Sequence, residues 1–193
     1  MILSGKEIFD IIAMSLIVGY IFSDVLKRFV YRAPESYDPL AAKPGFNWGS
    51  LKFAALATAP AIILHEFAHK FVAIGFGLEA TFNAAYFWLF LGLMMKLMGT
   101  GFIFFVPAYV SISGAGAVSP LSYSIVAFAG PAMNGIIWLI TTLMLKKNMV
   151  SKKYLSLVHI TKKINMFLFI FNMLPIPGFD GSKVFSGLLQ SIF

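Results

Sequence analysis

The chain has 193 residues, of which 59% are hydrophobic and only 12% are charged, and its mean hydropathy is +0.84. Soluble domains average about 25% charged residues, so this composition indicates an integral membrane protein with little room for a separate soluble module. The net charge is +7, but the lysines stand at the ends of apolar runs, which is typical of membrane-interface residues rather than of a nucleic-acid-binding surface.

The first apolar run, residues 8–30, predicts a membrane-spanning helix. It ends in Lys27 and Arg28, cations that suit both a helix C-terminus and a membrane interface. The region contains Glu7, Asp10 and Asp24 and has no small-residue cleavage site, so we expect a retained helix rather than a removed signal peptide. Residues 31–50 contain several prolines and predict a loop outside the hydrocarbon.

The second run, residues 51–73, is long enough to span a bilayer and contains the sequence HEFAH at residues 65–69. His65 and His69 are four residues apart, so on a helix they share one face and can reach one zinc ion. Glu66 lies between them, where it can deprotonate a water at the metal. Such residues are costly inside hydrocarbon, which favours a functional site over a chance occurrence of this short motif.

The region from residue 77 to residue 113 is less regular. Residues 77–83 predict a short extended segment, and the apolar stretch 84–98 is too short for a typical span, which favours a re-entrant or interfacial helix. Residues 101–113 are rich in aromatic and β-branched residues and predict one or two short strands. Open strands cannot face lipid, so they must line a protein-walled or watery cavity, where a free edge could receive an extended peptide.

Residues 121–145 predict a third span, closed by Lys146 and Lys147. Asn134 lies at mid-span depth, where an interhelical hydrogen bond and a role in catalysis are both open interpretations. Residues 151–171 begin with lysines and become apolar, which predicts a helix that starts at the interface. Altogether we expect a mainly α bundle of about four to six membrane segments with a small membrane-embedded β element.

The third metal ligand must be His, Asp or Glu, because the chain has no cysteine. Residues 172–181, NMLPIPGFDG, break the helix with two prolines and two glycines. Asp180 in this segment could cap a last helix over residues 183–193. The other acidic residues lie near the first span, in connectors or, as Glu66, within the histidine motif. Asp180 is therefore our predicted third ligand.

Three sequence blocks together resemble the site-2 protease family of intramembrane zinc metalloproteases. They are HEFAH, AGPAMN at residues 129–134 and NMLPIPGFDG, in the order of the family's motifs. The resemblance covers roughly residues 51–188, and it implies that His65, His69 and Asp180 bind one zinc ion. It also implies that Glu66 is the general base and that Asn172 holds the substrate or the oxyanion. The chain departs from the family in having Phe179 for the usual leucine, an extra apolar piece at 84–98, and no PDZ or CBS module.

The resemblance therefore predicts a single transmembrane metalloprotease domain over residues 1–193 that cleaves transmembrane helices of membrane-anchored substrates. Asn134 joins Asn172 as a candidate for substrate or oxyanion contact. The family places its site toward the cytoplasm, although the lysine distribution favours the opposite orientation. The alternative is a non-proteolytic zinc-binding membrane protein, either a transporter or an inactive scaffold that binds helices. The oligomeric state and the substrate are open at this stage.

Overall fold

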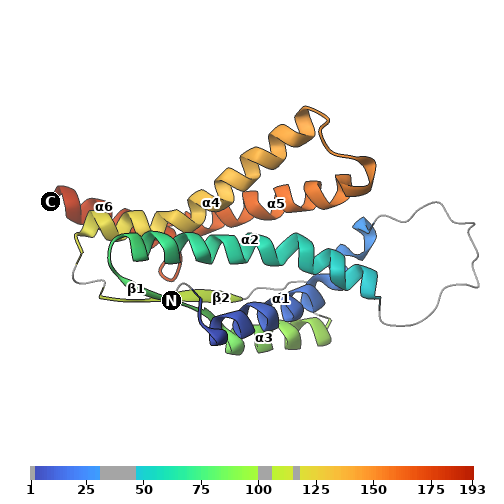
Figure 1. Ribbon diagram of the computed structural model, residues 1–193, viewed down its shortest axis with the longest axis horizontal. Coiled ribbons are helices and arrows are strands. Elements are labelled where there is room, and N and C mark those ends of the chain that lie inside the picture. Colours follow the sequence, from blue (N-terminus) through green and yellow to red (C-terminus); the bar gives the residue numbers. More distant parts are fainter. Residues whose placement is uncertain (1–2, 31–46, 100–105, 115–117) are drawn as a thin grey trace, which may run out of the picture.

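Helices form most of the protein, as expected. The computed structural model describes residues 3–30, 47–99, 106–114 and 118–193. Its longest helices are α1 (Gly5–Leu26), α2 (Trp48–Gly75), α4 (Pro120–Lys146) and α5 (Leu155–Asn172). These four helices, with short 3₁₀ turns at Lys27–Phe29 and Lys152–Tyr154, are long and apolar enough to cross a membrane. Figure 1 shows α2 in the middle of the bundle, with α1 on one side and α4 and α5 on the other.

Polar side chains fix where the long helices begin. Ser4 and Glu7 form a capping box at the start of α1, in which each side chain accepts a hydrogen bond from the other residue's main-chain N–H. The side chain of Asn47 caps α2 by accepting from the N–H of Ser50, and Ser119 caps α4 in the same way. The predicted loop over 31–50 therefore ends earlier than expected, because helix α2 already begins at Trp48; its residues 31–46 lie outside the described part of the chain.

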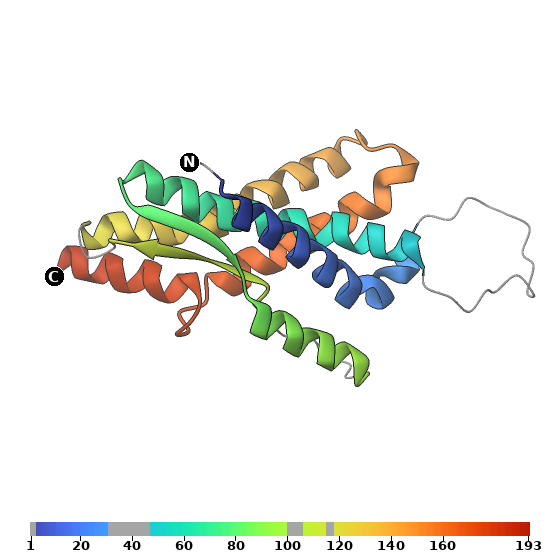
Figure 2. The same ribbon diagram turned by 60° about the horizontal axis from the view of Figure 1, so that its bottom comes forward.

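Two short strands form the predicted β element. β1 (Glu79–Ala84) and β2 (Ala108–Ser113) are antiparallel, with Glu79 opposite Ser113 and Ala84 opposite Ala108. They match the extended segments expected at 77–83 and 101–113, of which residues 101–105 lie outside the described ranges. Figure 2 shows this strand pair crossing one side of the helix bundle, with α3 continuing from the end of β1.

Helix α3 (Tyr86–Leu97) occupies the apolar stretch whose role the sequence left open. Its 12 residues measure about 18 Å, well short of a ~30 Å hydrocarbon core, so its length excludes a full crossing. Lys96 anchors it to α1: its ammonium group donates to the Ser23 hydroxyl at 2.8 Å and pairs with Asp24 at 3.0 Å. The last helix, α6 (Asp180–Ile192), follows the proline-rich break after α5.

Apolar packing holds the strands and helices around α2. Met14 and Val18 of α1 meet Phe82 of β1 and Leu89 of α3 in one fully buried cluster. Small residues let α1 and α2 approach closely: a methyl group added at Gly19 would lie 2.7 Å from Cβ of Ala55. Large apolar side chains elsewhere remain exposed on the helix surfaces, for example Phe9 and Ile12 of α1, as expected for a bundle surrounded by lipid.

Candidate metal centre

His65 and His69 lie on the face of α2 that is turned into the bundle. Both are buried, and their ring centroids are 4.7 Å apart, one helical turn along α2. Nδ1 of His65 lies 2.6 Å from Oδ1 of Asn134 in α4, and Nδ1 of His69 lies 2.8 Å from the carbonyl oxygen of Val126, also in α4. Both Nδ1 atoms therefore donate to oxygen acceptors, which leaves each Nε2 with a free lone pair.

Asp180 lies beside these histidines in space, although it follows them by more than 100 residues in the sequence. It is the first residue of α6 and not its N-cap, which is Phe179, so its carboxylate is available to the site. Oδ2 of Asp180 lies 3.1 Å from Nε2 of His65 and 3.2 Å from Nε2 of His69. The structure thus brings together the three residues that the sequence analysis selected as metal ligands.

Two glycines make this close approach possible. A Cβ atom at Gly130 of α4 would lie 2.2 Å from Nε2 of His69 and 2.6 Å from Nε2 of His65, so any side chain there would occupy the space between the rings. A Cβ at Gly181 would lie 2.5 Å from the main-chain carbonyl of Met173, so only glycine lets α6 start against the end of α5. These contacts explain on steric grounds why glycine occupies its position in the AGPAMN and FDG segments.

The donor set fits a zinc ion. The Nε2 atoms of His65 and His69 are 3.1 Å apart, and a carboxylate oxygen completes the triangle at nearly the same separations. A tetrahedral zinc ion with bonds of about 2.0–2.1 Å separates its ligand atoms by about 3.3 Å. Three lone pairs facing one another at such distances would repel without a cation between them, so two imidazoles and a carboxylate suit zinc in both chemistry and spacing.

Glu66 and Asn172 line the cavity onto which the metal ligands open. The cavity has a volume of about 780 Å³ and is bounded by α1, α2, β2, α4, α5 and the start of α6. Glu66 is buried beside the histidines, whereas Asn172, at the end of α5, is partly exposed and makes no side-chain hydrogen bond to a described residue. Its amide is therefore available to a bound molecule.

Asn134 lies behind His65 rather than on the cavity wall. It is fully buried, and besides facing His65 it donates to the carbonyl of Ala61 at 3.1 Å and to Oδ1 of Asn165 at 2.9 Å. This arrangement favours the interhelical hydrogen bond, one of the two interpretations that the sequence left open, over contact with substrate. Asn165 of α5 is equally buried and was missed, because a single asparagine in an amphipathic helix carries no motif.

Glu7 and Asp10 of α1 were assigned no role from the sequence, yet both are buried and bonded to β1. The sequence did contain a signal for them. Two carboxylates are energetically costly in an apolar span, so they mark a functional or structural polar site.

Two comparisons relate the chain to known proteins. The family model of peptidase family M50 matches residues 140–193, which include Asp180. A protein of Methanocaldococcus jannaschii named "Putative zinc metalloprotease" is 31% identical over 188 residues, which cover 94% of this chain and 84% of that protein. No solved structure matches the chain significantly.

The helical fold with four candidate spans and the buried His-His-Asp group fit the class that these comparisons indicate, a zinc metalloprotease with membrane-spanning helices. With this identity over nearly its whole length, the chain belongs to peptidase family M50, the site-2 protease family.

Proposed function

We propose that the chain is an intramembrane zinc endopeptidase that cleaves transmembrane helices of membrane-anchored proteins. One observation carries the proposal: His65, His69 and Asp180 converge on a single point, and Glu66 beside them opens onto the same cavity as strand β2. A cavity that contains both a metal site and a strand supplies the two things that peptide hydrolysis inside a membrane requires, a reactive centre and a means of holding an unwound chain.

Among the described residues, no strand pairs with the second edge of β2, and this edge supports the second requirement. The N–H groups of Phe82 and Ala84 in β1 donate to carboxylates of α1 and therefore point away from β2. The residues that alternate with them in β1 direct their main-chain N–H and C=O groups toward β2. By the observed register, Ala108, Val110 and Ile112 then direct their main-chain groups toward the other edge. These three residues line the cavity, and a substrate unwound from its helix could add there as a third strand.

In the proposed mechanism each site residue has one task. When bound, zinc supplies Lewis acidity that lowers the pKa of a water toward about 7. His65, His69 and Asp180 hold the metal, and Asn134 and the Val126 carbonyl fix the two imidazole rings. Glu66 accepts the proton of the attacking water and returns it to the leaving amine. Asn172 donates a hydrogen bond to the substrate carbonyl oxygen, where negative charge develops.

The same proposal covers the partners and the setting of the enzyme. The substrates are transmembrane proteins, the surrounding medium is the lipid bilayer, no nucleic acid is involved, and residues 1–193 act as one metalloprotease domain. The active site lies toward the cytoplasmic face, as the resemblance to the family implies. A zinc transporter would need a succession of sites through the bilayer, and the part of the chain that the structure describes contains one such group.

The decisive experiment compares wild type with Glu66→Gln in liposomes that contain a single-span substrate. The variant keeps the three metal ligands, so we expect it to retain one zinc per chain by metal analysis while cleavage falls by about 10²–10⁴-fold. Glu79→Gln, an exposed glutamate at the start of β1, is the matched control and should cleave like wild type. A zinc-loaded Glu66→Gln protein that cleaves at the wild-type rate would show that Glu66 is not the base. A zinc-loaded wild type that cleaves no transmembrane substrate would favour the non-proteolytic alternative.

A further inference from the structure

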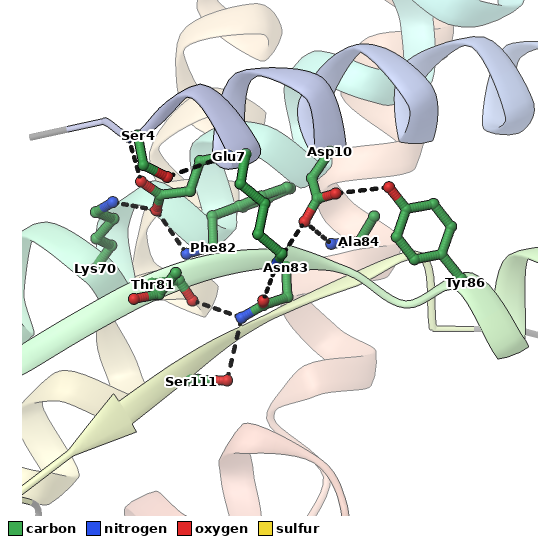
Figure 3. Close-up of polar contacts among 11 residues, drawn as sticks. Ser4, Glu7, Asp10, Lys70, Thr81, Phe82, Asn83, Ala84, Tyr86 and Ser111 are labelled. Carbon is green, nitrogen blue, oxygen red and sulfur yellow. Dashed lines mark hydrogen bonds and ion pairs between the residues drawn. The ribbon is translucent and has the colours of Figure 1, made fainter.

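The strand pair has two outer edges, and α1 occupies one of them. Figure 3 shows the carboxylates of Glu7 and Asp10 directed from α1 onto β1. Oε1 of Glu7 accepts from the N–H of Phe82 at 2.8 Å, and Oδ2 of Asp10 accepts from the N–H of Ala84 at 3.3 Å. The two carboxylates are one helical turn apart and bind amides two residues apart, so they take the place of a neighbouring strand.

The Glu7 carboxylate also ties the sheet to α2, the helix that carries both histidines. Oε1 of Glu7 also accepts from the ammonium group of Lys70, the residue after His69 in α2. Glu7 and Lys70 are only 3% and 2% exposed, so this ion pair is shielded from water. One oxygen atom therefore joins β1 to the helix that carries the two histidine ligands, and it fixes the position of the sheet along α2.

Asp10 is held just as firmly. Its Oδ1 accepts from the Tyr86 hydroxyl at 2.6 Å, and its Oδ2 also faces the ammonium group of Lys6 at 3.2 Å. The hydrogen bond to Asp10 and partial burial raise the pKa of Tyr86 to about 12, which reflects how strongly the carboxylate holds the phenol proton. Asp10 thereby connects the end of β1 with the start of α3.

Stability alone is a weak reason for these groups. The ion pair with Lys70 contributes little net stability, because desolvation offsets its attraction. The two carboxylates also satisfy amides of β1 that an apolar α1 would leave without partners. Apolar packing cannot, however, specify the register of a strand as hydrogen bonds to individual amides can. Glu7 and Asp10 thus fix the position of β1 in addition to satisfying its amides.

We propose that Glu7 and Asp10 are positioning residues that set which peptide bond of a substrate reaches the metal centre. By occupying the outer edge of β1 they leave the edge of β2 for the substrate. Glu7, through Lys70, holds the sheet at a fixed height relative to Glu66, and Asp10 fixes the end of β1. A substrate added to β2 then takes one register. This inference rests on the proposed function and names the residues that give it bond selectivity.

Cross-linking tests the register directly, because the chain has no native cysteine. Val110→Cys in the Glu66→Gln background is combined with single-cysteine substrates scanned along the transmembrane segment. We expect disulfide formation to peak at one substrate position, and Asp10→Ala to move or split that peak by two residues. A slip by one residue would exchange the two faces of the substrate strand, so a slip of two is favoured. Asp24→Ala is the control, since this carboxylate of α1 is 78% exposed.

The active proteins provide a second readout. With Asp10→Ala we expect cleavage at additional bonds two residues from the wild-type bond, identified by mass spectrometry. We also expect KM to rise about five-fold with a smaller change in kcat, because a correctly positioned strand edge contributes mainly to substrate binding. Asp10→Asn keeps one carbonyl oxygen and should fall between Asp10→Ala and wild type. If Asp10→Ala does not assemble with zinc, Asp10→Asn decides in its place.

The outcomes separate this inference from the function on which it rests. A wild type that neither cross-links at Val110→Cys nor cleaves the substrate would overturn the proposed function. The positioning role would be overturned by a different result. In that case the wild type cross-links and cleaves, and the zinc-loaded Asp10 variants show the same single cross-linking peak and the same single cleaved bond.

Discussion

Each histidine of the candidate metal centre uses one ring nitrogen for the protein and leaves the other available to the proposed metal. Asn134 and the Val126 carbonyl accept from the two Nδ1 atoms, and both acceptors belong to α4. One helix therefore orients both ligands presented by another helix. Outer partners of this kind typically contribute 10–100-fold to metal affinity. Because Asn134 also bonds to Ala61 and Asn165, it is itself held in one orientation.

Filling the space between the rings of His65 and His69 gives a testable prediction. Gly130→Ala places a methyl group within 2.2 Å of Nε2 of His69, where the metal belongs, so we expect zinc binding to be lost while the helices still assemble. Zinc per chain, measured by elemental analysis, should fall from about one to near zero, given the His₂Asp donor set.

The matched substitution is Gly135→Ala in the same helix. Its methyl group would meet only the ring edge of Phe169, at 3.3 Å, and that ring can shift. It should retain zinc. Full zinc occupancy in Gly130→Ala would contradict the position assigned to the metal.

At the scale of elements, the two strands have different neighbours. β1 lies against α1 and α2, where Phe82 is buried and packs edge-on against Phe67 at 6.1 Å between ring centroids. β2 has β1 on one side and the cavity on the other. A two-stranded sheet is marginal by itself, so β1 supplies the anchoring and β2 supplies the accessible edge.

Proline at Val110 tests the use of that edge. The substitution removes an N–H that points into the cavity while sparing the amides that face β1, so zinc binding should persist. We expect kcat/KM for a transmembrane substrate to fall by about ten-fold, since the substrate loses a main-chain hydrogen bond in the bound state. Val106→Pro, in the coil before β2, changes the cavity lining without entering the strand and serves as the control. Equal loss in both variants would argue against strand addition at β2.

The sequence predicted the parts of the site that obey local rules. The four-residue spacing of His65 and His69 implies a shared helix face, and the scarcity of acidic residues singled out Asp180, 111 residues after His69. Local sequence patterns could not predict that Glu7 and Asp10 bind β1, because the amides of Phe82 and Ala84 lie more than 70 residues away in the chain. The same holds for Asn134, whose two open interpretations could be separated only by seeing which way α4 faces α2.

At the scale of the whole molecule, cations gather at one end of the bundle. The end of α1, the start of α2 and the connection from α4 to α5 lie together in Figure 1, far from α6. This end carries Lys27 and Arg28, Lys146 and Lys147, and the lysines that precede α5. The positive-inside rule would place it in the cytoplasm, whereas resemblance to the family places the opposite end there.

Labelling of single cysteines in intact cells resolves this conflict. The proposed orientation predicts that Lys147→Cys reacts with a membrane-impermeant maleimide and that Glu79→Cys, at the other end of the bundle, reacts only after the cells are opened. Both positions are exposed, and the absence of native cysteines leaves no background. The reverse pattern would show that the lysines determine the orientation.

The separation of the metal ligands along the chain also bears on how the enzyme is made. His65 is synthesised 115 residues before Asp180, which at 5–20 residues per second is a delay of roughly 6–23 s. During that interval α2 is already long enough to insert, but it offers zinc only two of its three ligands. On the proposed function, a nascent chain in the translocon lacks its complete set of metal ligands and cannot cleave neighbouring membrane proteins until α6 docks against α4.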